Sequence, residues 1–117
     1  MLKKKMVLFL ITRIKVSKKN ELNDCLFVTG GKIKNEIDLP YRKSGSAALD
    51  MAYVAAGRYD GYFQNDLNLW DIAAGIVLIK ESGGIINEID LSINKNIKVI
   101  ASSADINSKL LEKLGNF

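Results

Sequence analysis

Asp71 is the residue whose type and position most clearly suggest chemistry in this sequence. It directly follows Trp70 and opens an apolar segment, Ile72-Ala73-Ala74-Gly75. A carboxylate in the first turn of a helix is favoured by the helix dipole, and its oxygens can bind a hard cation such as Mg²⁺. Aspartate is also common at helix starts as a structural cap. The spacing alone favours the cap and leaves both interpretations open.

Several kinds of catalytic chemistry are excluded by the residue types that the sequence lacks. It contains no histidine, which removes histidine bases, histidine metal ligands and histidine-dependent triads. The single cysteine, Cys25, lies in a segment predicted to be a buried strand, and we interpret it as an inert core thiol. Gly30-Gly31-Lys32 lacks the spacing of a phosphate-binding P-loop. Catalysis would therefore have to use carboxylates, hydroxyls, lysine or a hard metal ion.

The positive charge of the chain is concentrated at its N-terminal end. The net charge is +4, yet residues 20–117 hold 10 basic and 13 acidic residues, a balance of about −3. A nucleic-acid-binding domain is expected to carry basic residues across its folded body, interleaved with aromatic residues. The distribution argues against nucleic-acid binding as the main role. The seven basic residues of the first 19 positions are Lys3, Lys4, Lys5, Arg13, Lys15, Lys18 and Lys19.

Length and composition indicate a single globular domain. The chain has 117 residues, of which 48% are hydrophobic and 26% are charged, and it contains no repeat. Three lysines precede a short apolar run over 6–11, but that run is too short to span a bilayer and no signal-peptide cleavage site follows it. We therefore expect a cytoplasmic protein that makes no use of a membrane.

Two helices are predicted in the middle of the chain, and both contain small residues. The first begins at Ser44 or Ser46 and is ended by Gly57, with alanines that would let another backbone approach closely. The second covers about 70–81 and is apolar almost all round, so we expect it to be deeply buried. Gly75 lies inside this second helix, where glycine costs about 1 kcal/mol relative to alanine, and it indicates close packing.

Short β-rich segments predict strands that alternate with these helices. A closing amphipathic helix is predicted over 105–114, and an exposed lysine-rich loop over 30–43. The aromatic side chains, Trp70 included, are interpreted as core and rim packing and not as a platform for stacking bases. The alternation of strands and helices argues for a layered α/β domain. The predicted strands are 13–16, 25–29, 59–64, 85–89 and 97–101.

Segments along most of the sequence resemble the inositol monophosphatase family. Trp70–Gly75, followed by Glu81–Gly84, resembles the second signature of that family, and Gly45–Arg58 is similar to the segment just upstream of it. Arg13–Ser17 and Val28–Gly30 resemble its earlier strands. The resemblance implies a layered α-β-α sandwich of the sugar phosphatase type, with a mixed sheet flanked by helices. Only the C-terminal half of that fold is implied.

Carried over position by position, the resemblance implies roles for five residues. Asp71 would be a ligand of Mg²⁺, the cofactor of the family. Gln64 stands where many members have a glutamate that binds inositol hydroxyls. Glutamine keeps the hydrogen bonding without the charge, so recognition of a polyol is expected and inositol itself is left open. The turn that would contact the substrate with its backbone N–H groups consists of Gly45, Ser46 and Ala47.

The sequence departs from the family by an absence. Family members share an upstream Asp-Pro-x-Asp-Gly-Thr motif that provides most metal ligands, whereas the only proline here is Pro40 in another context. One aspartate cannot assemble the Mg²⁺ cluster that activates the attacking water. We therefore expect residues 13–117 to be the C-terminal domain of an inositol monophosphatase-like phosphatase, preceded by a lead-in over 1–12 from outside the family. The chain alone should be inactive.

Three functions remain open from the sequence. The first is a fragment of a Mg²⁺-dependent phosphomonoesterase that hydrolyses an inositol phosphate or a related polyol or sugar phosphate, as a homodimer or with a separate N-terminal half. The second is a module that binds RNA or transcription machinery through the basic first 19 residues. The third is a truncated gene product without function, whose uncovered apolar surface would make it aggregate.

Overall fold

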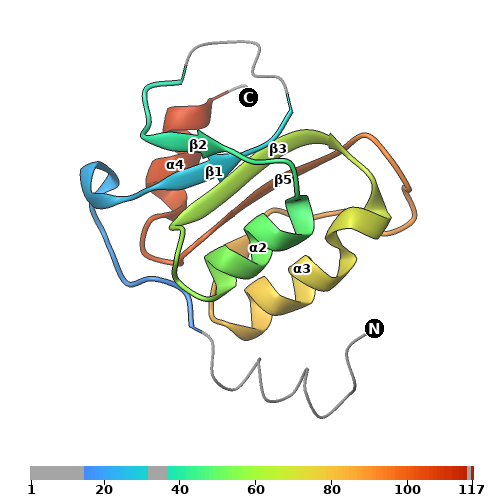
Figure 1. Cartoon of the computed structure of the whole chain (residues 1–117), viewed down its shortest axis with the longest axis horizontal. Coiled ribbons are helices and arrows are strands. Elements are labelled where there is room, and N and C mark those ends of the chain that lie inside the picture. Colours follow the sequence, from blue (N-terminus) through green and yellow to red (C-terminus); the bar gives the residue numbers. More distant parts are fainter. Residues whose placement is uncertain (1–14, 32–36, 116) are drawn as a thin grey trace.

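A five-stranded mixed sheet forms the central layer of the molecule, with helices on both of its faces (Figure 1). The strands are β1 (Phe27–Thr29), β2 (Tyr41–Lys43), β3 (Gly61–Leu67), β4 (Ile85–Ile86) and β5 (Ile97–Ser102). This computed structural model describes residues 15–31, 37–115 and 117. In the order β2-β1-β3-β5-β4, β1 pairs in parallel with both neighbours and β5 pairs antiparallel with both of its own. The predicted α-β-α sandwich with a mixed sheet is confirmed.

The helices divide between the two faces of the sheet. They are α2 (Ala47–Ala55), α3 (Leu69–Glu81) and α4 (Asn107–Leu114), and the 3-10 helix η1 (Leu22–Asp24) precedes β1. α2 and α3 lie together on one face, and α4 lies on the other (Figure 1). Alternate side chains of β3 build the two cores, because Tyr62 packs with α2 and α3 whereas Phe63 packs with α4. Both aromatic residues are fully buried, as predicted.

The ends of α2 and α3 follow the signals in the sequence. Ser46 caps the N-terminus of α2, where its side-chain oxygen accepts a hydrogen bond from Leu49 N at 3.2 Å. Gly57 follows α2 with a φ of +79°, a left-handed conformation that favours glycine. Gly83 follows α3 in the same way, with a φ of +88°. Both predicted helices are therefore confirmed.

α2 and α3 pack closely against each other at a glycine. A methyl group built on Gly75 would lie 2.6 Å from Met51 Sδ and 2.8 Å from Met51 Cβ. A side chain at this position would force the two helices apart or displace the methionine. The interpretation of Gly75 as a packing residue is confirmed.

Two predictions for the N-terminal third of the chain were wrong. The predicted loop over 30–43 contains β2, whose backbone pairs with β1 while Arg42 and Lys43 are exposed. Charged residues are common on edge strands because they discourage further pairing, and they concealed this strand from the hydrophobic pattern. The strand predicted over 13–16 lies partly outside the described residues, and its described half is not a strand. The other predicted strands are present with shifted or shortened ends.

α3 is not buried all round within the described part of the chain. It buries Ile72, Gly75 and Ile79, whereas Trp70 is 94% exposed and Val77 is 50% exposed. The predictions of a deeply buried helix and of a packed Trp70 were therefore wrong for this structure. The physical reason is that no described segment covers the outward side of the helix. Among the described helices, none has the length and apolar character needed to cross a membrane.

Candidate active site

A pocket of about 300 Å³ lies at the N-terminal ends of α2 and α3. It is formed by residues that follow β1, by the start of α2, by β3 and by the first turn of α3. All five residues to which the sequence analysis gave a role line this one pocket. The lining consists of Gly31, Ser44, Gly45, Ser46, Ala47, Ala48, Gln64, Leu67 and Asp71.

The turn that precedes α2 is fixed by hydrogen bonds to its surroundings. Ser44 N donates to Thr29 O at 2.8 Å, which ties the turn to the end of β1. Ser46 N donates to Ser44 Oγ at 3.3 Å, and the Ser46 hydroxyl oxygen caps the helix. Backbone N–H groups at a helix N-terminus, together with the helix dipole, favour an anion. This wall of the pocket therefore suits a negatively charged group such as a phosphate.

Gln64 is held at the pocket by its neighbour on the same face of β3. The Tyr62 hydroxyl donates a hydrogen bond to Gln64 Oε1 at 2.5 Å. With its oxygen engaged, the carboxamide keeps two N–H groups to offer to a ligand. A methyl group built on Gly31 would lie 3.4 Å from Gln64 Nε2, so the amide nitrogen faces Gly31.

Gly30 makes room for Gln64, and the sequence analysis missed it. A methyl group built on Gly30 would lie 2.5 Å from Gln64 Oε1 and 3.0 Å from Ser44 O. The glycines at 30 and 31 therefore shape the pocket, and Gly31 lines it directly. The available signal was a glycine pair directly after a buried strand, which marks a close approach of other groups to the backbone.

Two buried ionisable groups influence the electrostatics of the site. Asp50 is 2% exposed, and its Oδ2 has no hydrogen-bond partner among the described residues. Burial raises the pKa of Asp50, and a hydrogen bond with the Ser44 side chain acts in the opposite direction. Burial also raises the pKa of Tyr62, and the charges of Asp50 and Asp71 raise it further. Tyr62 therefore stays protonated and remains a donor to Gln64.

Neither of these groups was identified from the sequence. Asp50 has the pattern of an ordinary acid in the first turn of a helix, and Tyr62 that of a core aromatic residue. Their influence on the site depends on burial and on contacts that the sequence pattern does not specify. An acidic residue within an otherwise apolar stretch of predicted core was the only available signal for Asp50.

Asp71 lies in the first turn of α3 and is exposed at the pocket. Its carboxylate oxygens are hard ligands of the kind that Mg²⁺ prefers. Within residues 15–31, 37–115 and 117, however, no group of three or more acidic or cysteine side chains is placed to hold a metal ion. Asp71 could offer one ligand to a hard cation, but the described residues do not form a complete metal site. No hydrolytic step is therefore assigned to this chain alone.

Two other buried polar side chains, Asp60 and Cys25, have structural roles. Asp60 accepts hydrogen bonds from Leu26 N at 2.7 Å and from Ser17 Oγ at 2.5 Å. Its other contact is an ion pair with Lys19 Nζ at 3.3 Å, and together these fasten the segment before η1 to the sheet. Burial, and to a lesser degree the Asp60 charge, raise the pKa of Cys25 to about 11. The thiol stays protonated, in agreement with its predicted inertness.

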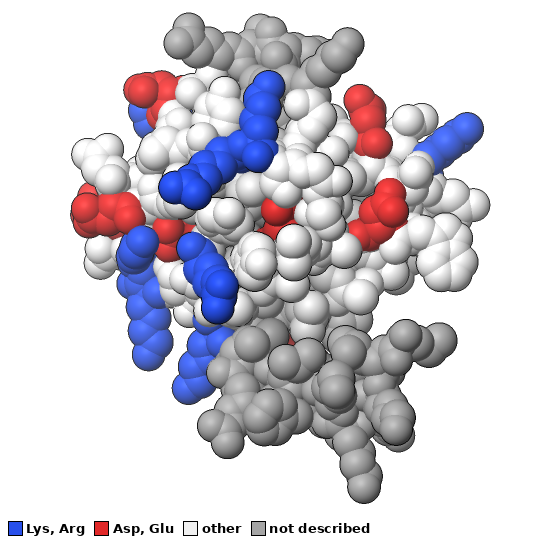
Figure 2. Space-filling model, in the orientation of Figure 1, with Lys and Arg blue, Asp and Glu red and all other residues white. Residues whose placement is uncertain are grey.

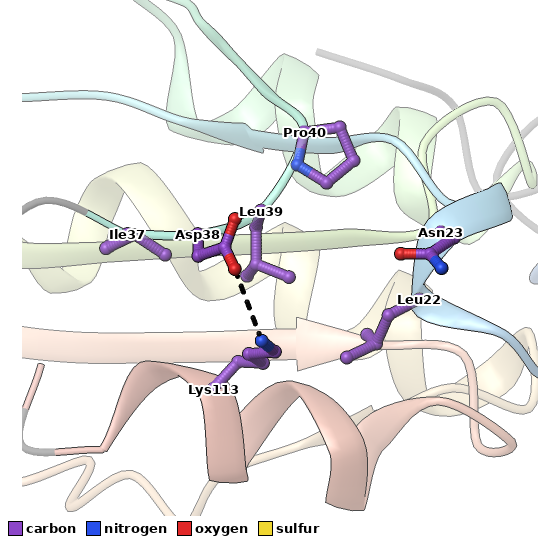
Figure 3. A pocket seen from close by; sticks show the side chains of 7 residues that line it. All are labelled: Leu22, Asn23, Ile37, Asp38, Leu39, Pro40 and Lys113. Atoms are coloured by element: carbon purple, nitrogen blue, oxygen red, sulfur yellow. Dashed lines mark ion pairs between the residues drawn. The ribbon is translucent and has the colours of Figure 1, made fainter.

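A second and larger pocket, of about 590 Å³, lies between η1, the segment at 37–40 and α4 (Figure 3). An ion pair joins two sides of this pocket, with Lys113 Nζ 3.5 Å from Asp38 Oδ2. The Asp38 side chain is 98% exposed and that of Lys113 is 45% exposed, so water screens the attraction. No residue with a predicted role lines this pocket. The pocket at α2 and α3 is therefore the candidate site.

The fold and the pocket define an α/β protein in which a helix N-terminus, a fixed amide and a carboxylate converge on one site. The chain belongs to the inositol monophosphatase family, whose sequence profile matches residues 3–116. The family predicted from the sequence is thereby confirmed. The predicted domain boundary at residue 13 falls inside this match and outside the described residues, and it stays a prediction.

Curated relatives of the chain carry two different names. The inositol-1-monophosphatase of Caulobacter vibrioides is 34% identical over 120 residues, which cover 87% of this chain and 47% of that relative. The Nus factor SuhB of Haemophilus influenzae is 32% identical over 119 residues, which cover 87% of this chain and 45% of that relative. The chain thus spans about half the length of the curated relatives it matches.

Solved structures share the fold of this chain. The extragenic suppressor protein suhB from Bartonella henselae matches with a TM-score of 0.75 and 35% identity, over 89% of this chain and 47% of that chain. Inositol monophosphatase from Anabaena (Nostoc) sp. matches with a TM-score of 0.73 and 32% identity, over 86% of this chain and 47% of that chain. The sandwich described above corresponds to about half of each of these structures.

Proposed function

We propose that this chain is the C-terminal half of a Mg²⁺-dependent phosphomonoesterase that hydrolyses a polyol or sugar phosphate to the alcohol and inorganic phosphate. The observation that carries the proposal is the convergence of Asp71, Gln64 and the turn at 45–47 on one pocket. Membership of the inositol monophosphatase family supports the reaction. The relative named inositol-1-monophosphatase supports inositol phosphate or a similar polyol phosphate as the substrate.

Each part of the pocket has a task in this proposal. The N-terminus of α2 and the turn at 45–47 would orient the substrate through backbone N–H groups. Gln64, fixed by Tyr62, would donate its amide N–H groups to a hydroxyl of the substrate. Asp71 would hold one Mg²⁺ ion. When bound in such a site, Mg²⁺ lowers the pKa of a coordinated water and neutralises charge on the leaving oxygen.

The chain alone would be inactive under this proposal. Asp71 is the only carboxylate in the lining of the described pocket, and the sequence lacks the Asp-Pro-x-Asp-Gly-Thr motif of the family. A single carboxylate leaves most of the coordination of a Mg²⁺ ion to water and holds it weakly. The remaining ligands would come from a polypeptide that carries the N-terminal half of the family fold.

Phosphate release from inositol 1-phosphate tests this proposal. We expect no Mg²⁺-dependent release by the chain alone, and release when it is co-expressed with the N-terminal half of the C. vibrioides relative. Asp71→Asn should abolish the release, whereas Asp66→Asn, at an exposed position outside the pocket lining, should leave it unchanged. Turnover by the chain alone, or full activity with Asp71→Asn, would contradict the proposal.

The name Nus factor SuhB, carried by several relatives, favours a second candidate function. In this alternative the chain is a module that binds RNA or transcription machinery, with the basic residues of the first 19 positions contacting phosphates. RNA binding that weakens with salt and is lost on removal of residues 1–19 would support it. Binding that does not depend on salt would count against it.

The third possibility, a truncated gene product without function, makes a different prediction. Such a chain would aggregate through its uncovered apolar surface. A monomer that melts cooperatively would count against it. The cytoplasmic location expected from the sequence stays a prediction.

A further inference from the structure

Gln64 is a polar residue of the candidate pocket whose side chain is oriented by a buried partner. Tyr62 is fully buried, and its hydroxyl donates a hydrogen bond to Gln64 Oε1 at 2.5 Å. A carboxamide has one acceptor oxygen and one nitrogen with two N–H donors. Because Tyr62 engages the oxygen, the nitrogen is the part of the amide that is left to meet a ligand.

The two glycines after β1 support the same orientation of the amide. A methyl group built on Gly30 would lie 2.5 Å from Gln64 Oε1, so the oxygen occupies space that only a glycine leaves free. A methyl group built on Gly31 would lie 3.4 Å from Gln64 Nε2, and Gly31 lines the pocket. The amide nitrogen therefore faces a residue of the pocket lining, and the oxygen is held by Tyr62.

Helix ends, and not basic side chains, provide the positive charge of this pocket. The first turns of α2 and α3 both line it, and the dipole of each helix places partial positive charge there. The described lining residues include no lysine or arginine. In Figure 2 the lysine and arginine side chains lie mainly around the periphery of the visible face, and the area over α2 is mostly uncharged. A ligand oxygen therefore meets N–H groups in this pocket, with Asp71 as the only carboxylate of the lining.

An amide and a carboxylate at position 64 select opposite groups of a ligand. An ionised carboxylate only accepts hydrogen bonds, so it selects a hydroxyl and repels an anion. The oriented amide of Gln64 offers only N–H donors, so it selects an acceptor. A hydroxyl can serve as that acceptor, but a hydrogen bond to an ionised oxygen is about twice as strong as one between neutral groups. The amide therefore favours an anionic oxygen.

We propose that the Tyr62–Gln64 pair makes this pocket select a polyol or sugar phosphate that carries a second anionic group, a carboxylate or a further phosphate, beside Gln64. The inference rests on the proposed function and names the class of its substrate. The phosphate to be hydrolysed belongs on the side of Asp71, and the second anionic group accepts from Gln64 Nε2. A neutral polyol monophosphate is still bound, but less tightly. Tyr62 is a positioning residue in this arrangement, because it acts through Gln64.

Three ligands with the same carbon chain test this preference. Glucitol 6-phosphate has a hydroxyl at C1, 6-phosphogluconate has a carboxylate there, and glucitol 1,6-bisphosphate has a second phosphate. Their dissociation constants for the chain alone, without Mg²⁺, are measured by NMR from the amide resonances of the pocket, with the Gln64 side chain included. The phosphate at C6 is common to all three, so its interaction with Asp71 cancels in the comparison. We expect at least one of the two doubly anionic ligands to bind about fivefold more tightly than glucitol 6-phosphate.

Three variants test whether Gln64 and Tyr62 cause the preference. Gln64→Glu should reverse it, so that glucitol 6-phosphate becomes the tightest of the three ligands. Tyr62→Phe keeps the buried ring but frees the amide to turn, and it should bring the three dissociation constants within about twofold of one another. Tyr59→Phe is the matched control, because Tyr59 packs against the same core but does not line the pocket. This control should keep the preference of the unsubstituted chain.

The outcomes separate this inference from the proposed function, because the binding measurement needs neither turnover nor a second polypeptide. Tighter binding of 6-phosphogluconate or of the bisphosphate assigns the second group as a carboxylate or a phosphate. That preference without phosphatase activity in the co-expressed pair would support the inference and contradict the proposed function. Equal affinity for the three ligands, no binding of either doubly anionic ligand, or a preference that Gln64→Glu leaves unchanged would overturn the inference, even if the co-expressed pair releases phosphate.

Discussion

α3 and α4 flank the same sheet from opposite sides, and they differ in what their outward sides carry. α4 buries Leu110 and Leu114 and presents the lysine of the ion pair with Asp38 to solvent. α3 buries three residues and exposes a further apolar row that includes Trp70 and Val77. The described residues cover the buried side of each helix, but they leave an apolar row on α3 uncovered. An amphipathic pattern thus marks a helix with one covered side, and a pattern apolar all round marks a helix that needs two.

The two buried aspartates, Asp60 and Asp50, differ in whether all their carboxylate oxygens have partners. Asp60, near the N-terminal segment, has a hydrogen-bonding or ionic partner for both of its oxygens. Asp50, on α2 beside the candidate site, leaves Oδ2 without one among the described residues. Polar groups in a finished core are normally satisfied. The unsatisfied Oδ2 of Asp50 is therefore a feature of α2 that stability alone does not explain.

Shortening one side chain on each side of α3 gives the largest expected difference in the free energy of unfolding. Ile79 is fully buried, so Ile79→Ala should lower the free energy of unfolding by about 2–5 kcal/mol. Val77 is half exposed, and Val77→Ala should change it by no more than about 0.5 kcal/mol in the chain alone. Urea unfolding measures both. Losses of equal size would mean that the outward side of α3 is already covered in the chain alone.

A methyl group between the two helices tests their close packing. Gly75→Ala should lower the free energy of unfolding by about 1–3 kcal/mol, because the new carbon would lie 2.6 Å from Met51 Sδ. This net loss already includes the gain of about 1 kcal/mol that alanine has over glycine in a helix. Gly45→Ala is the matched control, since a methyl group there meets no atom within 4 Å. Stabilisation by Gly75→Ala would disprove the close contact.

Removal of the cap of α2 should have an intermediate effect on stability. Ser46→Ala deletes the oxygen that accepts from Leu49 N and should lower the free energy of unfolding by about 1 kcal/mol. Ser108→Ala, at an exposed position on α4 with no capping role, should leave it nearly unchanged. Thermal unfolding followed by circular dichroism distinguishes the two. An unchanged Tm for Ser46→Ala would show that the cap contributes nothing.

Substitution of Asp50 should have the smallest effect and should depend on pH. Because burial raises its pKa above the value in the unfolded chain, charged Asp50 opposes folding at neutral pH. Its contribution is most favourable below the unfolded pKa and is lost as the pH rises through the folded pKa. Asp50→Asn should therefore raise the Tm by a few degrees at pH 7, with a difference that shrinks as the pH falls toward about 4. A difference independent of pH would contradict this.

Most of the fold could be predicted because its signals are local. Ser46, Gly57 and Gly75 act through their own backbone or side-chain geometry, and the structure shows each in the expected position. β2 was missed because its two charged residues hide an edge strand. The exposure of Trp70 was missed because a hydrophobic pattern shows that a surface should be covered and not which chain covers it.

The residues of the candidate site were likewise predicted only in part. Its five predicted residues came from a resemblance in sequence, and the structure brings them to one pocket. Gly30 and Asp50 were missed because their importance arises from contacts between segments, such as that of Gly30 with Gln64. Spacing within one segment does not contain that information. The described residues contain no further carboxylate in the pocket lining, so the proposed metal ligands beyond Asp71 could not be located from this structure.

The central claim is that Asp71 is one ligand of a metal site that this chain shares with another half of the fold. Calorimetric titration with Mg²⁺ tests it most directly, on the chain alone and on its complex with the N-terminal half of the relative. We predict saturable binding by the complex and by its Asp66→Asn variant, and much weaker binding by the chain alone and by the Asp71→Asn complex. Equal Mg²⁺ affinity of the Asp71→Asn and unsubstituted complexes would contradict the claim.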